Sequence, residues 1–184
     1  MIRWFLRRQI AAYQRTWNYD TSYIQEIVDA DPRAVWAFSK VMGFTQYRKD
    51  VPPAVYYAAK IIGTMAEDCG PCTQLAVDMA ARAGVDAAVL RAIVAGDIAA
   101  MPDDVALAVR FTRATLQHDW EADALREELI HRWGKRGLIS LAFAITAARL
   151  FPTLKYALGH GRACMRVTVG GETRSVLRDA RQAA

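Results

Sequence analysis

Two cysteines separated by two residues, Cys69 and Cys72, stand between two segments that both have the pattern of a helix. Residues 53–67 are rich in alanine with apolar residues at helical spacing, and residues 73–82 continue in the same way. In the α/β redox folds such a pair follows a buried strand of a βαβ unit, and no strand pattern precedes this one. The pair therefore predicts a junction between two helices in an all-α fold.

The chemistry that this spacing predicts is thiol–disulfide exchange. Two thiols so close in sequence can form a disulfide, and a helix that begins at the pair makes one of them reactive. The helix dipole and the unpaired N–H groups of the first turn favour a thiolate. Because Cys69 lies at or just before this turn, the dipole predicts that it is the more acidic thiol.

The stretch of residues 56–96 carries a resemblance to a known family. An alanine-rich helix runs into Glu-Asp-Cys-Gly-Pro-Cys at residues 67–72, a second helix follows, and Asp86 opens a third. This order resembles the AhpD-like alkylhydroperoxidase and carboxymuconolactone decarboxylase superfamily, and a looser likeness continues to about residue 163. The resemblance implies a compact multi-helix bundle, a homo-oligomer, and a peroxide-reducing or disulfide-bearing protein as partner.

The chain departs from that family at two positions of its proton relay. The family's peroxidases have a histidine four residues after the second cysteine, where this chain has Ala76. They also have an acidic residue about three helical turns before the first cysteine, where this chain has Tyr57. Glu67 is the best substitute for a general base, and Tyr57 could donate a hydrogen bond. Glu67 could instead be an acidic residue that stabilises a helix start. A relay would favour Cys72 as the attacking thiol and the dipole favours Cys69, so both stay open.

The length of the chain and the positions of its prolines and glycines predict one domain. A chain of 184 residues that is 53% hydrophobic can bury a core without a structural metal. We expect an N-terminal helical extension over residues 1–50, a core over 51–163 and a tail over 164–184. Prolines and glycines divide the chain into helix-length segments, with helix starts at Asp31-Pro32 and at Pro102-Asp103. Residues 165–169 alternate polar and β-branched side chains, and two glycines follow them. This is the one place where we expect a short β-hairpin.

We expect a cytoplasmic protein. Three cysteines in a chain of this length suit a reducing compartment, and no apolar signal region follows the basic N-terminus. The longest apolar run, residues 138–148, is shorter than the roughly 18 residues of a membrane span. We interpret it as a buried helix at the centre of the bundle or, preferably, at a contact between subunits.

The first residues predict an amphipathic helix. An apolar stripe of helical spacing is formed by Ile2, Leu6, Ile10, Tyr13 and Trp17. Such a helix could lie on a membrane surface. We instead expect it to pack on its own core or on a neighbouring subunit.

Two further classes of ligand are not predicted. The net charge of +5 is spread along the chain without a recognised nucleic-acid-binding motif, so we expect no nucleic acid. Cys69 and Cys72 could be half of a zinc site completed by His160 and Cys164, but the closely spaced half-sites of zinc knuckles are missing. We predict no metal and no cofactor.

The sequence favours an enzyme, with alternatives. The first prediction is a thiol–disulfide oxidoreductase or peroxidase-like antioxidant protein that uses Cys69 and Cys72 on a peroxide or small disulfide. One alternative is a non-catalytic oligomeric helical protein with a redox-sensitive disulfide. Another, from the decarboxylase branch of the resemblance, is a cofactor-free carboxymuconolactone decarboxylase-like enzyme.

Overall fold

The fold is a helical bundle with one small hairpin, as the sequence predicts. The computed structural model describes residues 2–161 and 166–175, and helices account for 75% of them. The described elements are α1 (Ile2–Trp17), α2 (Ser22–Ala30), α3 (Pro32–Ser39), α4 (Met42–Thr45), α5 (Pro53–Ala66), α6 (Gly70–Arg82), α7 (Ala87–Ala95), the 3-10 turn η1 (Ile98–Ala100), α8 (Asp103–Gln117), α9 (Glu121–Ala157), β1 (Arg166–Val169) and β2 (Glu172–Ser175).

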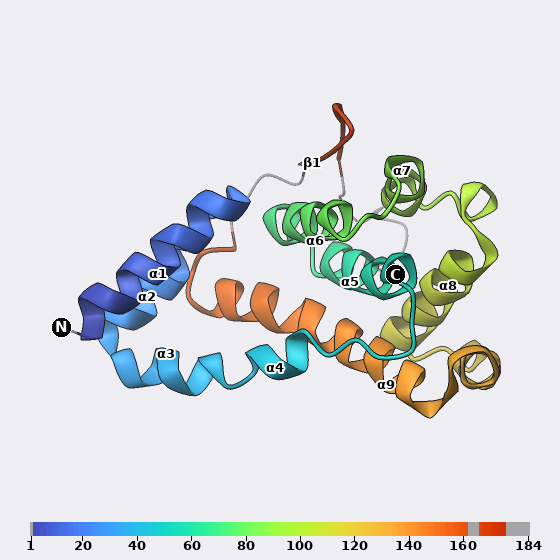
Figure 1. Cartoon of the computed structure of the whole chain (residues 1–184), viewed down its shortest axis with the longest axis horizontal. Coiled ribbons are helices and arrows are strands. Elements are labelled where there is room, and N and C mark those ends of the chain that lie inside the picture. Colours follow the sequence, from blue (N-terminus) through green and yellow to red (C-terminus); the bar gives the residue numbers. More distant parts are fainter. Residues whose placement is uncertain (1, 162–165, 176–184) are drawn as a thin grey trace.

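Helix α5 lies at the centre of the core. It packs against α6, α7, α8 and α9, while α1 to α4 extend to one side, where α3 and α4 run along α9 (Figure 1). Its alanines and isoleucines explain this position, because Ala58, Ala59 and Ile61 are completely buried. Small side chains allow the neighbouring helices to approach closely, and Gly63 faces Ala148 of α9. The position of α5 fixes the end of the helix that meets the cysteine pair.

The predicted helix starts are confirmed where capping chemistry was visible in the sequence. The Asp31 carboxylate accepts a hydrogen bond of 2.8 Å from the backbone N–H of Arg33 and caps α3. Helix α8 follows Pro102, and both Asp103 and Asp104 lie in its first turn, where carboxylates complement the helix dipole.

Helix α9 is bent in its first half. Gly134 has φ 66° and ψ 178°, which interrupts the helical backbone, so the predicted break lies at this glycine. The apolar run 138–148 follows the bend and buries Leu141 and Ala144 against the core, while Ile139 is 42% exposed. One face of the run is therefore a core face and the opposite face reaches the surface.

Helix α9 is also, in the described part of the chain, the one helix long and apolar enough to cross a membrane by length and composition. The core helix of a soluble protein meets the same criteria. Here α9 packs against α4, α5, α6 and α8.

Helix α1 lies beside α2 at the left of Figure 1. Four members of the predicted stripe, Leu6, Ile10, Tyr13 and Trp17, are partly buried, and Ile2 is 65% exposed. The apolar face of this helix is thus turned toward the protein except at its first turn.

The predicted hairpin is present. Strands β1 and β2 pair antiparallel through Gly170 and Gly171, whose φ angles of 56° and 86° suit the two-residue turns that join such strands. Val167 is buried beneath it. The Gln74 side chain of α6 accepts from the N–H of Thr168 at 2.7 Å and donates to its C=O at 3.0 Å. These bonds hold the hairpin on α6 (Figure 1).

Candidate functional site

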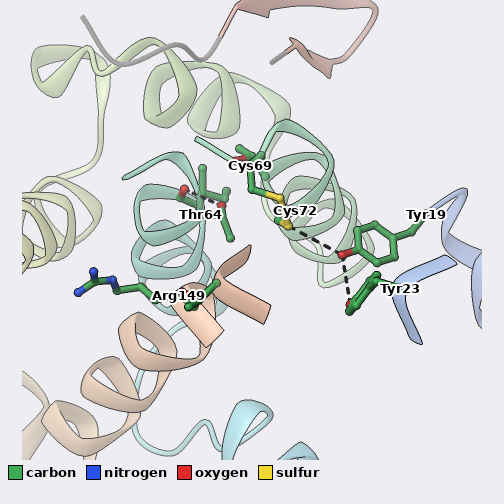
Figure 2. The surroundings of a disulfide bond; sticks show 9 residues. Tyr19, Tyr23, Thr64, Cys69, Cys72 and Arg149 are labelled. Atoms are coloured by element: carbon green, nitrogen blue, oxygen red, sulfur yellow. Dashed lines mark hydrogen bonds between the residues drawn. A yellow bond between two sulfur atoms is a disulfide. The ribbon is translucent and has the colours of Figure 1, made fainter. Parts of the chain in front are cut away.

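The two cysteines form a disulfide at the start of α6 (Figure 2). Cys69 is the N-cap residue of α6, and Cys72 lies in its first turn, as the sequence predicts. The backbone N–H of Cys69 donates to the carbonyl of Thr64 at 3.4 Å, so the end of α5 holds the pair in place. Their side chains are 5% and 6% exposed, which shields the disulfide from most of the solvent.

A tyrosine from the N-terminal extension contacts the disulfide. The Tyr19 hydroxyl lies 3.8 Å from the Cys72 sulfur and 3.4 Å from the Tyr23 hydroxyl (Figure 2). A disulfide sulfur carries no proton, so Tyr19 donates this hydrogen bond. Burial raises the pKa of both tyrosines, so their hydroxyls stay protonated at neutral pH. Tyr19 is therefore a hydrogen-bond donor to Cys72, and the Tyr23 hydroxyl contacts that of Tyr19.

A buried lysine packs on the same two rings. The Lys155 ammonium lies 5.1 Å from the centre of the Tyr19 ring and 5.4 Å from that of Tyr23. Lys155 is only 2% exposed, and its burial lowers its pKa while the charge of Asp20 opposes that shift. The ammonium therefore lies against the two tyrosine rings, one of which carries the hydroxyl that contacts Cys72.

His160 lies behind the tyrosine pair. Its ring centre is 6.4 Å from that of Tyr23, its Nδ1 lies 3.2 Å from the Ser22 hydroxyl, and its Nε2 lies 2.7 Å from a Glu26 carboxylate oxygen. Among the described contacts, His160 touches Tyr23, and Tyr23 touches Tyr19, the residue that donates to Cys72.

A cavity of about 260 Å³ opens beside the disulfide. Cys72 forms part of its wall and Cys69 does not. Ala76, four residues further along α6, lies in the same wall, which is apolar at this position. Of the two sulfurs, Cys72 is therefore the one that a molecule in this cavity would meet.

The two other predicted site residues lie away from this wall. Glu67 ends α5 and pairs with Arg149 of α9 through an oxygen 2.5 Å from the guanidinium Nε. Tyr57 packs edge-on against Tyr56 at 5.4 Å between ring centres, and burial raises its pKa. Neither lines the cavity, and their predicted roles remain predictions.

Sequence reasoning missed Tyr19, which contacts Cys72, and the two residues that contact Tyr19, namely Tyr23 and Lys155. It also missed Lys60 in the cavity wall. The available signal was the concentration of tyrosines between residues 13 and 23, because a buried tyrosine needs a partner for its hydroxyl.

The zinc site that the sequence does not favour can be located only in part in the structure. Cys69 and Cys72 are bonded to each other, and Cys164 lies outside the described residues. Within residues 2–161 and 166–175, no group of three or more histidine, cysteine, aspartate or glutamate side chains could hold a metal ion.

Comparisons with known protein families, with curated proteins and with solved structures found no match.

Proposed function

We propose that this protein is a thiol–disulfide oxidoreductase with peroxidase-like activity, and that Cys72 is the thiol that attacks the substrate. The observation that carries the proposal is the position of Cys72 in the wall of an apolar cavity, beside the Tyr19 hydroxyl. A reactive cysteine needs access to a substrate and a neighbour that stabilises its thiolate. The cavity supplies the first, and the Tyr19 hydroxyl supplies the second.

The proposed reaction starts from the reduced pair. The Cys72 thiolate attacks the terminal oxygen of a hydroperoxide, the O–O bond breaks, and the alkoxide takes up a proton and leaves as an alcohol. Cys72 is then a sulfenic acid. The Cys69 thiol attacks its sulfur, water leaves, and the disulfide seen here forms. An external dithiol reduces this disulfide by two electrons and completes the cycle.

The same pair would reduce a disulfide substrate. The Cys72 thiolate attacks one substrate sulfur and releases the other as a thiol. The Cys69 thiolate then attacks the Cys72 sulfur of the mixed disulfide and releases the second substrate thiol. A disulfide-bearing or peroxide-reducing protein partner is part of the proposal, as is kinship with the AhpD-like family. In that case Tyr19 of the N-terminal extension takes the place of the family's relay, with a hydroxyl that donates to the thiolate.

The proposal is tested by turnover. The reduced protein is mixed with dithiothreitol and either cumene hydroperoxide or a small aromatic disulfide, and the loss of oxidant is followed. Turnover that exceeds the uncatalysed reaction and requires both cysteines supports the proposal. A rate equal to that of dithiothreitol alone with both oxidants would exclude it.

Tyr19→Phe is predicted to make Cys72 less acidic. It removes the hydroxyl 3.8 Å from the sulfur and keeps the ring that packs on Lys155. A hydrogen bond to a charged group contributes about 1.5 kcal/mol, so its loss should raise the thiol pKa by about one unit. At neutral pH we expect alkylation of reduced Cys72 by iodoacetamide to slow about tenfold, as measured by mass spectrometry over a pH series.

Tyr13→Phe is the matched control, because Tyr13 lines the same cavity and its ring packs against Tyr19. It should leave the pH profile of alkylation unchanged. Glu67→Gln tests the other candidate: a slower alkylation in Glu67→Gln but not in Tyr19→Phe would assign the acid–base role to Glu67 and refute the role proposed for Tyr19.

A second candidate function rests on the burial of the pair. With side chains 5% and 6% exposed, Cys69 and Cys72 could form a disulfide that only locks α6 to the end of α5. In that case reduction would change stability and there would be no turnover. The turnover assay separates this redox latch from the enzyme.

We also propose assembly into a homo-oligomer in the cytoplasm. Large apolar side chains are exposed on the described surface, among them Trp4 at 65%, Trp36 at 70% and Trp120 at 84%. Contacts between copies would cover such groups.

A further inference from the structure

The cavity beside Cys72 contains one poorly compensated positive charge. Lys60 of α5 lies in its wall, and its ammonium donates to the carbonyl of Thr45 at 2.7 Å and lies 5.0 Å from the centre of the Tyr56 ring. No carboxylate is among the described residues that line the cavity. Burial lowers the pKa of Lys60 to about 8, so the group is still mainly an ammonium at neutral pH. A cation in such surroundings is costly without an anionic partner.

The Thr45 carbonyl is already shared. It accepts a second hydrogen bond of 2.9 Å from the Tyr56 hydroxyl, so Lys60 is held by a neutral acceptor that has another donor. An ammonium has three N–H donors. The side of Lys60 that meets the cavity can therefore bind an anion without breaking its existing contact.

Most of the remaining wall is apolar. Side chains from the N-terminal extension, from α6 and from α9 form most of it, including Ile24, Val35, Phe38, Leu75, Met79 and Phe151. A volume of about 260 Å³ lies just below the range of roughly 300–1,000 Å³ for drug-sized ligands. The space suits a slender aliphatic chain rather than a nucleotide or a sugar.

Lys60 lies in the middle of α5, and Cys72 lies in the first turn of α6. Lys60 and Thr64 are one helical turn apart on the same face of α5, and both line the cavity. The Thr64 carbonyl accepts from the N–H of Cys69, at the start of the turn that contains Cys72. A molecule held by Lys60 therefore lies in the cavity whose wall contains the Cys72 sulfur.

We propose that this cavity binds a monocarboxylic acid with one long apolar tail, whose carboxylate pairs with Lys60 and whose tail packs on the apolar wall. The inference rests on the proposed function in one respect, because it names the substrate class of that site: a medium-chain acid that carries its hydroperoxide or disulfide on the tail. Reduction at Cys72 would then follow the steps given above.

The test measures binding to the oxidised full-length protein, where no turnover occurs. Decanoate and decan-1-ol are titrated at pH 7 by isothermal titration calorimetry into the wild type and Lys60→Met. We expect Lys60→Met to weaken decanoate binding at least tenfold and to leave decan-1-ol within twofold of the wild type. Lys60→Arg should retain decanoate binding because it keeps the charge. Equal decanoate affinity in the wild type and Lys60→Met would overturn the inference.

Lys135→Met is the matched control, because Lys135 is an exposed residue of α9 outside the cavity wall and the same charge is removed. Its decanoate affinity should equal that of the wild type, and an equal loss in both variants would overturn the specific role of Lys60. Cumene hydroperoxide turnover without any binding of decanoate would overturn the inference and leave the proposed function standing. Selective decanoate binding that needs Lys60, in a protein without turnover, would support this ligand site and refute the proposed function.

Discussion

Cys72→Ser is expected to lower dithiol-dependent turnover roughly 1,000-fold or more, because it removes the nucleophile itself. Cys69→Ser should also end turnover, but with a different signature. Its Cys72 can still attack one hydroperoxide, and the resulting sulfenic acid then lacks its partner. Rapid-mixing measurements should therefore show about one equivalent of peroxide consumed per Cys69→Ser chain and none by Cys72→Ser.

The control for both variants is Cys164→Ser, at a position outside the described residues. It should keep full turnover. Thermal unfolding of the reduced variants should match that of the reduced wild type, because a core of this size does not depend on the pair. If Cys69→Ser were inert and Cys72→Ser consumed one equivalent, Cys69 would be the attacking thiol, as the helix dipole alone predicts. Full turnover in both variants would refute a redox enzyme.

Gly63→Ala is expected to destabilise the fold by about 1–3 kcal/mol, although alanine usually stabilises a helix. A Cβ atom at Gly63 would lie 2.6 Å from the Ala148 Cβ of α9, far inside contact distance. Alanine has no flexible end that could move away, so the helices themselves must separate. Urea unfolding of the reduced protein measures the change in the free energy of unfolding.

Gly43→Ala is the matched control for this substitution. Gly43 is also helical, in α4, and nothing lies within 4 Å of a Cβ built on it. We expect it to be neutral or to stabilise by up to about 1 kcal/mol. Opposite signs for the two variants would support the close packing of α5 on α9, and equal effects would contradict it.

Local signals predicted the helices and the hairpin well. The Asp31 cap, the acidic first turn of α8 and the two glycines at 170 and 171 act over a few residues, so their effect can be seen in the sequence. The position of the cysteine pair at the start of α6 was predicted for the same reason. The length of α9 was not, because its bend at Gly134 continues into a second helical stretch instead of ending the helix.

The surroundings of Cys72 depend on long-range packing and could not be predicted in this way. Tyr19 is 53 residues away in sequence, and Glu67 is 82 residues away from Arg149, with which it pairs. The short distance in sequence between Glu67 and the cysteines favoured it as a general base. Sequence spacing does not show that a distant residue, Arg149, forms an ion pair with its carboxylate. The N-terminal extension, which the family resemblance does not cover, supplies the Tyr19 hydroxyl that contacts Cys72.

The most direct measurement is differential alkylation with mass spectrometry of the three cysteines across a series of thiol/disulfide buffers. We predict that Cys69 and Cys72 switch together between roughly −180 and −300 mV, and that Cys72 alkylates fastest at neutral pH once reduced. Cys164 serves as the internal reference. If the pair does not switch in this range, or if Cys72 reacts no faster than Cys164 when reduced, a redox-active Cys72 is contradicted.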